Sequence, residues 1–300
     1  MTTIAVVAHV GSTLGGGLEE LREVLAAEGV TDLLWYEVSD IRAASERARR
    51  ARQEGADLVF IWGGDGTLQR CIDGLANTGA TIAIMPAGTA NLLAANLGIP
   101  TDLRKAVKIG LYGARRPLDT GSVNGEHFAV MAGAGFDALT VRDADSGLKG
   151  SIGSAAYLWS GAFNLKAPTV GASIAVDGEP FFQGELSCVL TANVGKLLGG
   201  IEAFENAKPD DGMLELAVIT AKNRIQWTRT LGRVALGVAE HSPFVEVTPG
   251  RRFEIRFARP FLYELDGDPR KAVRRLRVAV DPGSITICVP HSGSEQGTRP

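Results

Sequence analysis

The sequence has few cysteines and no long apolar run, and each absence excludes a class of protein. Its 300 residues include only three cysteines, Cys71, Cys188 and Cys288, which lie far apart and form no CxxC pair. A zinc site or a disulfide framework is therefore not expected, and the odd count favours buried thiols in a reducing compartment. No apolar stretch approaches the ~20 residues that a helix needs to cross a bilayer.

A large charge of one sign and a signal peptide are also missing. The net charge is −3, so we do not expect a nucleic-acid-binding protein. The N-terminal segment "MTTIAVVAHVGS" has no basic start, and it predicts a strand rather than a signal peptide. We therefore expect a cytoplasmic protein, which would meet any lipid from the water side. The four histidines show no spacing typical of metal ligands.

The first 110 residues alternate apolar runs with helical patterns, which predicts an α/β domain with a parallel sheet. In such sheets, ligands bind beyond the carboxyl ends of the strands. The expected strands are Ile4–Ala8, Leu33–Val38, Leu58–Trp62 and Ile82–Met85, and the expected helices lie near Leu18–Leu25, Asp40–Glu54, Thr67–Leu75 and Ala90–Asn96.

After about residue 118 the pattern changes to alternating strands joined by Gly- and Asp-rich turns, which predicts an antiparallel, β-rich region. Helical patterns interrupt it near Ser154–Leu165 and Ile225–Val238. We therefore expect an α/β domain over 1–119, which a strand near 284–290 could complete. A β-rich domain is expected over 120–283, followed by a polar, disordered tail over 291–300.

The stretch "IWGGDGTLQRCIDG", residues 61–74, places three glycines around one acid directly after an apolar strand. Gly63 and Gly64 can adopt positive φ and let a ligand approach the main chain. The helix that follows directs unpaired amide groups at the same space, which suits a phosphate. Asp65 would serve there by holding Mg²⁺ or by accepting a hydrogen bond from a hydroxyl. The alternative is a tight turn in which Asp65 caps the helix. The sequence contains no P-loop motif.

A second strand, turn and helix follow in "TIAIMPAGTANLLAANLGIP". Pro86 and Gly88 shape this turn, and Thr89 and Asn91 supply polar side chains at the start of the helix. Their simplest alternative role is N-capping. Because both glycine turns follow neighbouring strands, we expect them to line the same edge of one sheet.

These two motifs, "GGDGT" and "PAGTAN", resemble the catalytic domain of diacylglycerol kinases, a group that includes bacterial lipid kinases and sphingosine and ceramide kinases. The resemblance continues through "RPLDTGSVNG", "AGAGFDA", "ENAKPDDGMLELAVI" and "LDGDP", in the order typical of the family. It implies an N-terminal domain that binds ATP, a sandwich-like domain that binds lipid, and catalysis in the cleft between them.

The resemblance also implies roles for particular residues. Asp119 would join an acidic network around Mg²⁺, and Asp211 would hold a structural Mg²⁺ with the carbonyl groups of Lys208 and Met213. Asp266 is the favoured general base and Asp65 the organiser of phosphate and metal, although the two roles could be exchanged. The residues expected to approach the nucleotide are Gly63, Gly64, Gly66, Thr67, Gly88, Thr89 and Asn91.

Local patterns leave other interpretations open. Asp266 lies in an Asp-Gly pair, which is a strong hairpin signal, and the segment around Asp211 could be a metal-free turn. The segment Arg251–Arg277 holds nine Lys or Arg residues against four Asp or Glu residues. This basic segment could attract an anionic membrane, or it could be a solvated strand face with salt bridges.

The sequence departs from the family pattern at three places. The first loop reads "AHVGSTLGGG" in place of an Asn-Pro segment, and Leu92 follows Asn91 where the family often has Asp. The second acid of the late motif is Asp268 in place of Glu.

We predict an ATP-dependent lipid kinase that uses Mg²⁺ and acts on lipid at a membrane surface. The alternatives are a kinase of a soluble acceptor such as NAD, or a weakened nucleotide- or lipid-binding regulator. The sequence leaves open whether the chain forms a homodimer.

Overall fold

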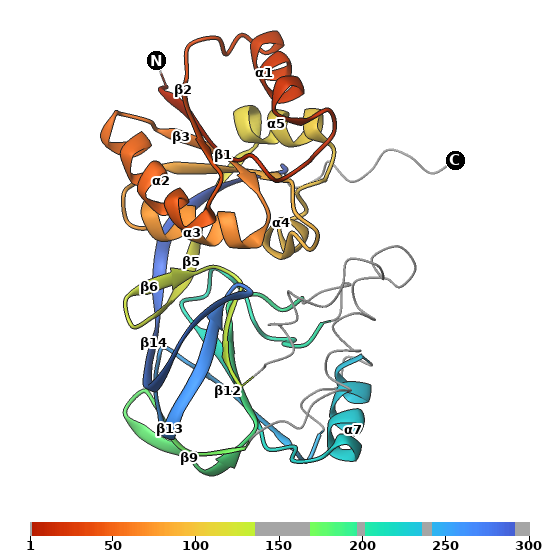
Figure 1. Cartoon of the computed structure of the whole chain (residues 1–300), viewed down its shortest axis with the longest axis vertical. Helices are drawn as coiled ribbons and strands as arrows, with labels where there is room; N and C mark the ends of the chain where they lie inside the picture. The colour runs from red at the N-terminus through yellow and green to blue at the C-terminus, as the bar shows by residue number, and fades with distance from the viewer. Residues whose placement is uncertain (1, 136–168, 197–201, 236–241, 292–300) are drawn as a thin grey trace. The chain divides into compact units, whose positions relative to one another are not determined.

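A computed structural model describes residues 2–135, 169–196, 202–235 and 242–291 (Figure 1). The chain divides into two compact units, which we describe separately. The first comprises Met1–Leu118 and Gly283–Pro300, and the second comprises Asp119–Pro282.

The first unit is built on a parallel sheet in the order β14-β4-β3-β1-β2. Helix α2 packs against α3, and α1 contacts α5. All six residues of β3 are buried, because parallel strands linked by helical crossovers are covered on both faces. The strands are β1 (Ile4–His9), β2 (Leu34–Val38), β3 (Leu58–Gly63) and β4 (Thr81–Pro86), and the helices are α1 (Gly17–Ala27), α2 (Ala44–Gln53), α3 (Asp65–Leu75), α4 (Leu92–Asn96) and α5 (Leu103–Tyr112).

The second unit consists mainly of antiparallel strands, with β10 between β7 and β11, and β13 between β8 and β14. Strand β13 alternates exposed and buried residues over its first half, as expected for a strand with one face in the core. The elements are β5 (Ala114–Val123), β6 (Glu126–Phe128), β7 (Met131–Ala134), β8 (Val170–Val176), β9 (Glu179–Leu186), β10 (Cys188–Ala192), β11 (Leu214–Ile219), α7 (Arg224–Ala235), β12 (Val245–Gly250), β13 (Arg252–Leu265) and β14 (Asp268–Val289).

The long strand β14 contributes residues to both units. Its last residues pair with β4, through Thr286 with Thr81 and Ile287 with Ile82, and extend the parallel sheet of the first unit. The fold class predicted from the sequence, a parallel α/β domain plus a β-sandwich-like domain, is confirmed.

Two local elements differ from expectation. The helix expected from Asp40 begins with a 3-10 turn over Ile41–Ala43, because the Asp40 side chain accepts a hydrogen bond from the amide of Arg42. Helix α5 was not predicted, although Asp102 caps it by accepting a hydrogen bond from the amide of Lys105. The helical pattern of Ser154–Leu165 and the tail from residue 292 lie outside the described residues. No helix in the described ranges is long and apolar enough to span a membrane.

Candidate active site

The two glycine turns of the first unit are in contact. Strands β3 and β4 pair in parallel up to Gly63 and Pro86, so their turns begin at the same edge of the sheet. A Cβ atom added at Gly88 would lie 2.4 Å from the Cα atom of Gly64. Only glycine fits at this contact, and the two turns form one continuous backbone surface.

The glycines at 63 and 64 are needed for close packing. The sequence analysis had instead expected them to adopt positive φ. Neither Gly63 nor Gly64 has a positive φ, and Gly64 is extended, with φ −88° and ψ −172°. A Cβ atom at Gly63 would lie 2.5 Å from the Cβ atom of Thr67, which packs directly over it. The expectation of positive φ at Gly63 and Gly64 was therefore wrong. Close tertiary contacts, and not the backbone conformation, exclude a side chain at these positions.

Asp65 connects the two turns. The N-cap of α3 is Gly64, without a side-chain capping bond, so Asp65 does not cap its own helix. Its Oδ1 atom instead accepts a hydrogen bond from the amide of Leu92 at the start of α4, at 2.7 Å. Burial raises the pKa of Asp65, although the amides of Leu92, Leu93 and Asn91 oppose the shift. A carboxylate that is partly desolvated beside a helix start can interact with a cation or a hydroxyl.

The contact to Leu92 bears on one departure from the family pattern. Position 92 contributes its main-chain amide, which any residue except proline would supply. The missing carboxylate at this position therefore leaves the bond to Asp65 intact.

Asn91 shapes the second turn from within. Its φ is +48°, and its Oδ1 atom accepts a hydrogen bond from the amide of Gly88 at 2.9 Å. Its Nδ2 atom donates to the carbonyl groups of Pro86 and Gly88, at 3.1 and 2.9 Å. The side chain does not cap α4, so N-capping does not explain Asn91. Thr89 is exposed at the tip of the same turn.

The geometry of these turns suits an anionic ligand. Helix α3 has 11 residues, and helix geometry leaves the amides of its first turn, including those of Gly66 and Thr67, without intrahelical acceptors. Such amides and the positive end of the helix dipole favour phosphate. The residues predicted to approach the nucleotide are therefore brought together in the first unit.

In the second unit, Asp119 is held by the loop that contains Asp211. The buried Asp119 donates its amide to the carbonyl of Pro209 at 2.7 Å, and its Oδ2 atom accepts from the amide of Gly212 at 2.7 Å. Asp211 is exposed, and its Oδ1 atom accepts from the amide of Met213 at 2.9 Å. The structure thus places Asp119 in contact with the loop that contains the other predicted metal residues, Lys208, Asp211 and Met213.

The donor set of this loop fits a weakly held hard cation. Across the described parts of the chain, no three His, Cys, Asp or Glu side chains gather as a metal site. Mg²⁺ needs only one or two carboxylates when main-chain oxygens and water complete its coordination. Asp211 and the loop carbonyl groups are donors of the kind that Mg²⁺ accepts, and Asp119 lies beside the same loop.

Asp266 lies in a hairpin turn and also has contacts far from the turn. Asp266 and Gly267 have φ values of 46° and 82°, as a tight hairpin between β13 and β14 requires. The buried carboxylate accepts hydrogen bonds from three consecutive amides, those of Ala129, Val130 and Met131, at 2.8–2.9 Å. The hairpin interpretation is thus correct for the backbone, whereas the carboxylate anchors the segment before β7.

The second acid of the late motif is part of an ion-pair network. Asp268 lies 2.9 Å from Nη1 of Arg270, whose Nη2 contacts Glu126. The shorter Asp268 side chain is thus accommodated by a bond to a half-buried arginine.

Glu264 is a buried carboxyl group that the sequence did not single out. Its Oε1 atom is inaccessible and has no hydrogen-bond partner within the described structure. Burial is the main cause that raises the pKa of Glu264 to about 8, with a further contribution from Asp266. Asp268 adds to the shift and Arg270 opposes it. No local pattern reveals Glu264, because its burial depends on neighbouring strands.

Replacing Glu264 with glutamine is expected to stabilise the protein increasingly as the pH rises above about 4.5, with the full effect above pH about 8. The folded state holds the Glu264 proton up to pH about 8, whereas the unfolded chain loses it near pH 4.5. The stabilising effect of that proton is therefore complete below pH 4.5 and disappears as the pH rises to about 8. At pH 9 the variant should melt at least about 2–4 °C above the wild type, and at pH 4 the two should melt alike. Thermal melts across this range measure the difference, and parallel curves would contradict it.

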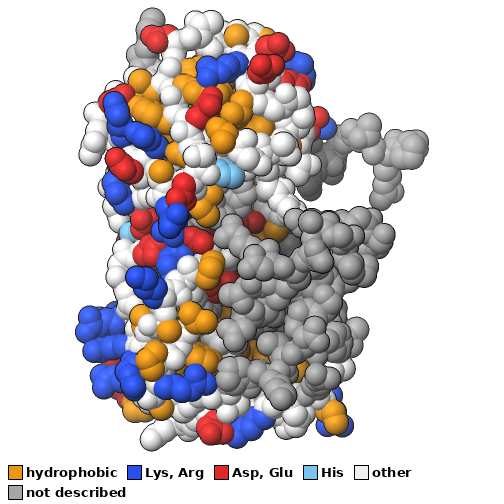
Figure 2. Space-filling view, in the orientation of Figure 1, with side chains coloured by type: hydrophobic (Ala, Val, Ile, Leu, Met, Phe, Trp, Pro, Cys, Tyr) orange, Lys and Arg blue, Asp and Glu red, His pale blue; other side chains and the backbone are white. Residues whose placement is uncertain are grey.

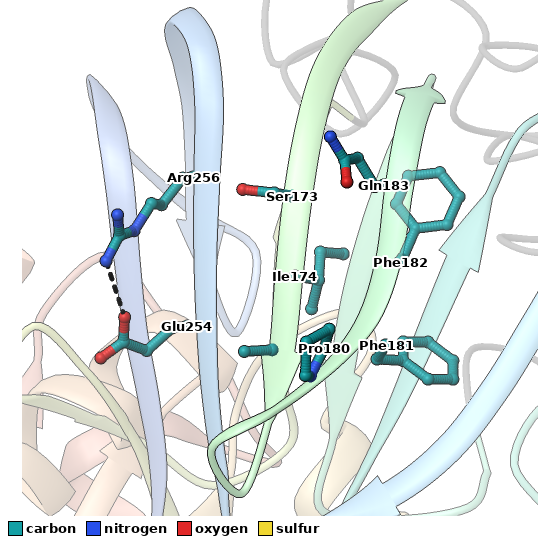
Figure 3. Close-up of a pocket in the computed structure, with 9 residues that line it drawn as sticks. Ser173, Ile174, Pro180, Phe181, Phe182, Gln183, Glu254 and Arg256 are labelled. Atoms are coloured by element: carbon teal, nitrogen blue, oxygen red, sulfur yellow. Dashed lines mark hydrogen bonds and ion pairs between the residues drawn. The ribbon is translucent and has the colours of Figure 1, made fainter.

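A shallow cavity of about 340 Å³ on the second unit contains none of the predicted site residues. Figure 3 shows Phe181 and Phe182 of β9 on one side and the ion pair of Glu254 and Arg256 on β13. The basic segment predicted from the sequence contributes Glu254 and Arg256 to the lining of this cavity. Figure 2 shows Lys and Arg side chains gathered at the lower left, where Figure 1 labels β13 and β14. Arg256 and Arg275 both pair with Glu254, so part of the segment is a salt-bridged strand face.

Comparisons with known proteins agree with this arrangement. Residues 11–123 match the diacylglycerol kinase catalytic domain, and residues 130–289 match the YegS C-terminal NAD kinase beta sandwich-like domain. The chain is 32% identical over 289 residues, 91% of either protein, to a protein of Pseudomonas aeruginosa (strain UCBPP-PA14) named "Probable lipid kinase YegS-like". It is also 32% identical over 234 residues, 75% of either protein, to the diacylglycerol kinase of Bacillus subtilis (strain 168).

Solved structures show the same fold. A diacylglycerol kinase from Bacillus anthracis str. Sterne superposes with a TM-score of 0.79 at 22% identity, over 96% of this chain and 97% of that one. An NAD kinase from Archaeoglobus fulgidus, solved with ATP, gives a TM-score of 0.52 at 14% identity over 96% and 94% of the two chains.

The fold and the matched segments define a two-domain protein of kinase architecture. The chain belongs to the diacylglycerol kinase catalytic-domain family, with the second domain of the YegS-like lipid kinases.

Proposed function

We propose that this protein is an ATP-dependent lipid kinase that transfers the γ-phosphate of ATP to a lipid hydroxyl. The observation that carries the proposal is the pair of touching glycine turns at the ends of β3 and β4, bridged by the bond from Leu92 to Asp65. Amides at the start of α3 would bind the phosphates, and the tightly packed glycines would let them approach the main chain. The relatives named as lipid kinases support the choice of a lipid acceptor.

The two catalytic carboxylates have different proposed roles. Asp65 organises the phosphate region, because it joins both glycine turns and is partly desolvated. Asp266 is the favoured base for the acceptor hydroxyl, and three main-chain amides hold its carboxylate in place. A base that accepts the hydroxyl proton would promote attack on phosphorus.

Mg²⁺ would neutralise charge on the transferred phosphoryl group. Within this chain, Asp119 is proposed to belong to the acidic network around that Mg²⁺, whereas Asp211 is proposed to hold a separate structural cation with the carbonyl groups of Lys208 and Met213. The ligands of the structural cation would fix the loop at 208–213 beside Asp119, an arrangement that the hydrogen bond from the Gly212 amide to Asp119 already favours.

The acceptor class is tested by comparing extracted lipids with NAD in the presence of ATP. Phosphorylation of a lipid fraction supports the proposal, and phosphorylation of NAD alone would make the protein a kinase of a soluble acceptor. Binding of ATP without turnover of either would support a regulatory protein.

We further propose that the protein binds its lipid substrate at a membrane surface. The exposed arginines of β13 and β14 would favour this through their attraction to anionic headgroups.

Replacing Asp211 with alanine is expected to remove the Mg²⁺ dependence of the melting temperature. A cation that binds only the folded state stabilises it by an amount that grows with the logarithm of the ratio of its concentration to its Kd, so loss of the Asp211 carboxylate removes that increment. Asp210→Ala is the matched control, because it removes the neighbouring acid from the same loop. Melting curves with and without Mg²⁺ measure the effect, and a wild-type protein that melts identically in both would exclude a structural cation here.

A further inference from the structure

Asn193 is a buried residue that directly follows β10 and has no assigned role. Its side chain is 1% exposed, and its Nδ2 atom donates to the carbonyl groups of Asp119 and Ala129, both at 2.9 Å. Its main-chain amide donates to the carbonyl of Val130 at 2.9 Å. The amide orientation is determined by these partners, because reversal would place Oδ1 against two carbonyl oxygens.

Asn193 and Asp266 bind the same two peptide groups from opposite ends. The peptide between Ala129 and Val130 receives Asn193 at its carbonyl and donates its N–H to Asp266. The next peptide, between Val130 and Met131, does the same through the main-chain amide of Asn193. A peptide that accepts at one end is polarised into a better donor at the other. The bonds made by Asn193 therefore strengthen those that hold the Asp266 carboxylate.

We propose that Asn193 is the positioning residue for the Asp266 carboxylate. It fixes two of the three amides that orient Asp266, and it ties them to Asp119, which the loop at 209–212 holds in turn. The catalytic meaning of this role rests on the proposed function, whereas the positioning itself concerns the fold of the second unit alone.

The remaining atom of the Asn193 amide supports a role beyond stability. Its Oδ1 atom is buried without a hydrogen-bond partner in the part of the chain that the structure describes. An unsatisfied buried acceptor costs free energy, and the two hydrogen bonds that Nδ2 donates offset that cost. What this position uses is the pair of N–H groups on Nδ2, which donate to the carbonyl groups of Asp119 and Ala129.

The test compares Asn193→Ala with Thr191→Val. Thr191 is two residues earlier on β10, is equally buried, and donates from Oγ1 to the carbonyl of Ala132 at 3.2 Å. The control thus removes a similar bond to β7 without touching the peptides bound by Asp266. We expect amide hydrogen exchange at Val130 to be about ten-fold faster in Asn193→Ala and unchanged in Thr191→Val, whereas exchange at Met131 should change less, because alanine keeps the main-chain bond to the carbonyl of Val130. The kcat for lipid should fall roughly ten-fold or more, as for other supporting residues, with the KM for ATP unchanged.

Several outcomes would overturn the proposal. Exchange at Val130 that is no faster than in the control would show that the Asn193 side chain does not hold this peptide. Faster exchange with an unchanged kcat would make Asn193 structural only. If Asn193→Ala does not fold, Asn193→Ser, which keeps one donor, should give intermediate exchange, and wild-type rates in it would overturn the proposal equally. If the wild type phosphorylates no lipid, the proposed function fails and the exchange comparison alone decides the positioning role.

Discussion

Replacing Asp65 with asparagine is expected to lower lipid phosphorylation by roughly 100-fold or more without lowering the melting temperature. Asparagine keeps an oxygen that can accept from the amide of Leu92, so the bridge between the two turns survives. The substitution removes the negative charge, which is the property that the proposed role of Asp65 requires. A loss of turnover in a fully folded protein would therefore report the charge itself.

The stability of this variant follows from the direction of the pKa shift. Burial raises the pKa of Asp65 in the folded protein, so its proton contributes stability at pH values below the unfolded pKa. That contribution is lost as the pH rises through the folded pKa, and the ionised carboxylate opposes folding at neutral pH. Asp65→Asn should consequently melt at the same temperature as the wild type or higher at pH 7.5.

Asp73→Asn provides the matched control for Asp65. Asp73 lies on the same helix, and its carboxylate interacts with Ser45 and Arg49 rather than with the glycine turns. The control should retain activity within a few-fold of the wild type. Near-normal turnover of Asp65→Asn would remove Asp65 from the mechanism, and a parallel loss of turnover and melting temperature would show that the bridge is only structural.

Replacing Asp266 with asparagine is expected to reduce both turnover and stability. Its carboxylate accepts three main-chain hydrogen bonds, and the asparagine amide would direct an NH₂ group at one or two of these donors. Loss of buried hydrogen bonds of this kind costs about 1–3 kcal/mol. Loss of a general base lowers kcat by roughly 10²–10⁴-fold. The two effects are separated by measuring turnover at a temperature where the variant is fully folded.

Asp177→Asn is the matched control for Asp266. Asp177 also precedes glycine in a hairpin, with a φ of 52°, and accepts from the amides of Arg251 and Arg252, but it is exposed. The control should be nearly silent in both assays. If folded Asp266→Asn binds ATP normally and its turnover collapses, the catalytic role is supported. Turnover within a few-fold of the wild type would defeat that role and return the general base to Asp65.

The sequence by itself determined the fold class and the family. Helical and alternating periodicities are local, so they identified the parallel α/β region, the β-rich region and the positions of both glycine turns. The order of the motifs, from "GGDGT" to "LDGDP", predicted the family that the comparisons confirm. Even the Asp-Gly hairpin at Asp266 was predicted, because turn chemistry depends on adjacent residues.

Only the tertiary structure decided what the key side chains contact. Asp65 accepts from an amide 27 residues later, and Asp266 from amides up to 137 residues earlier in the chain. The glycines at 63, 64 and 88 are required by close approach between turns or side chains, which φ preferences do not reveal. Asn193 and Glu264 lay in ordinary strand patterns, and their importance comes from burial and from distant partners. Such contacts arise when segments far apart in sequence pack together, and no local pattern encodes them.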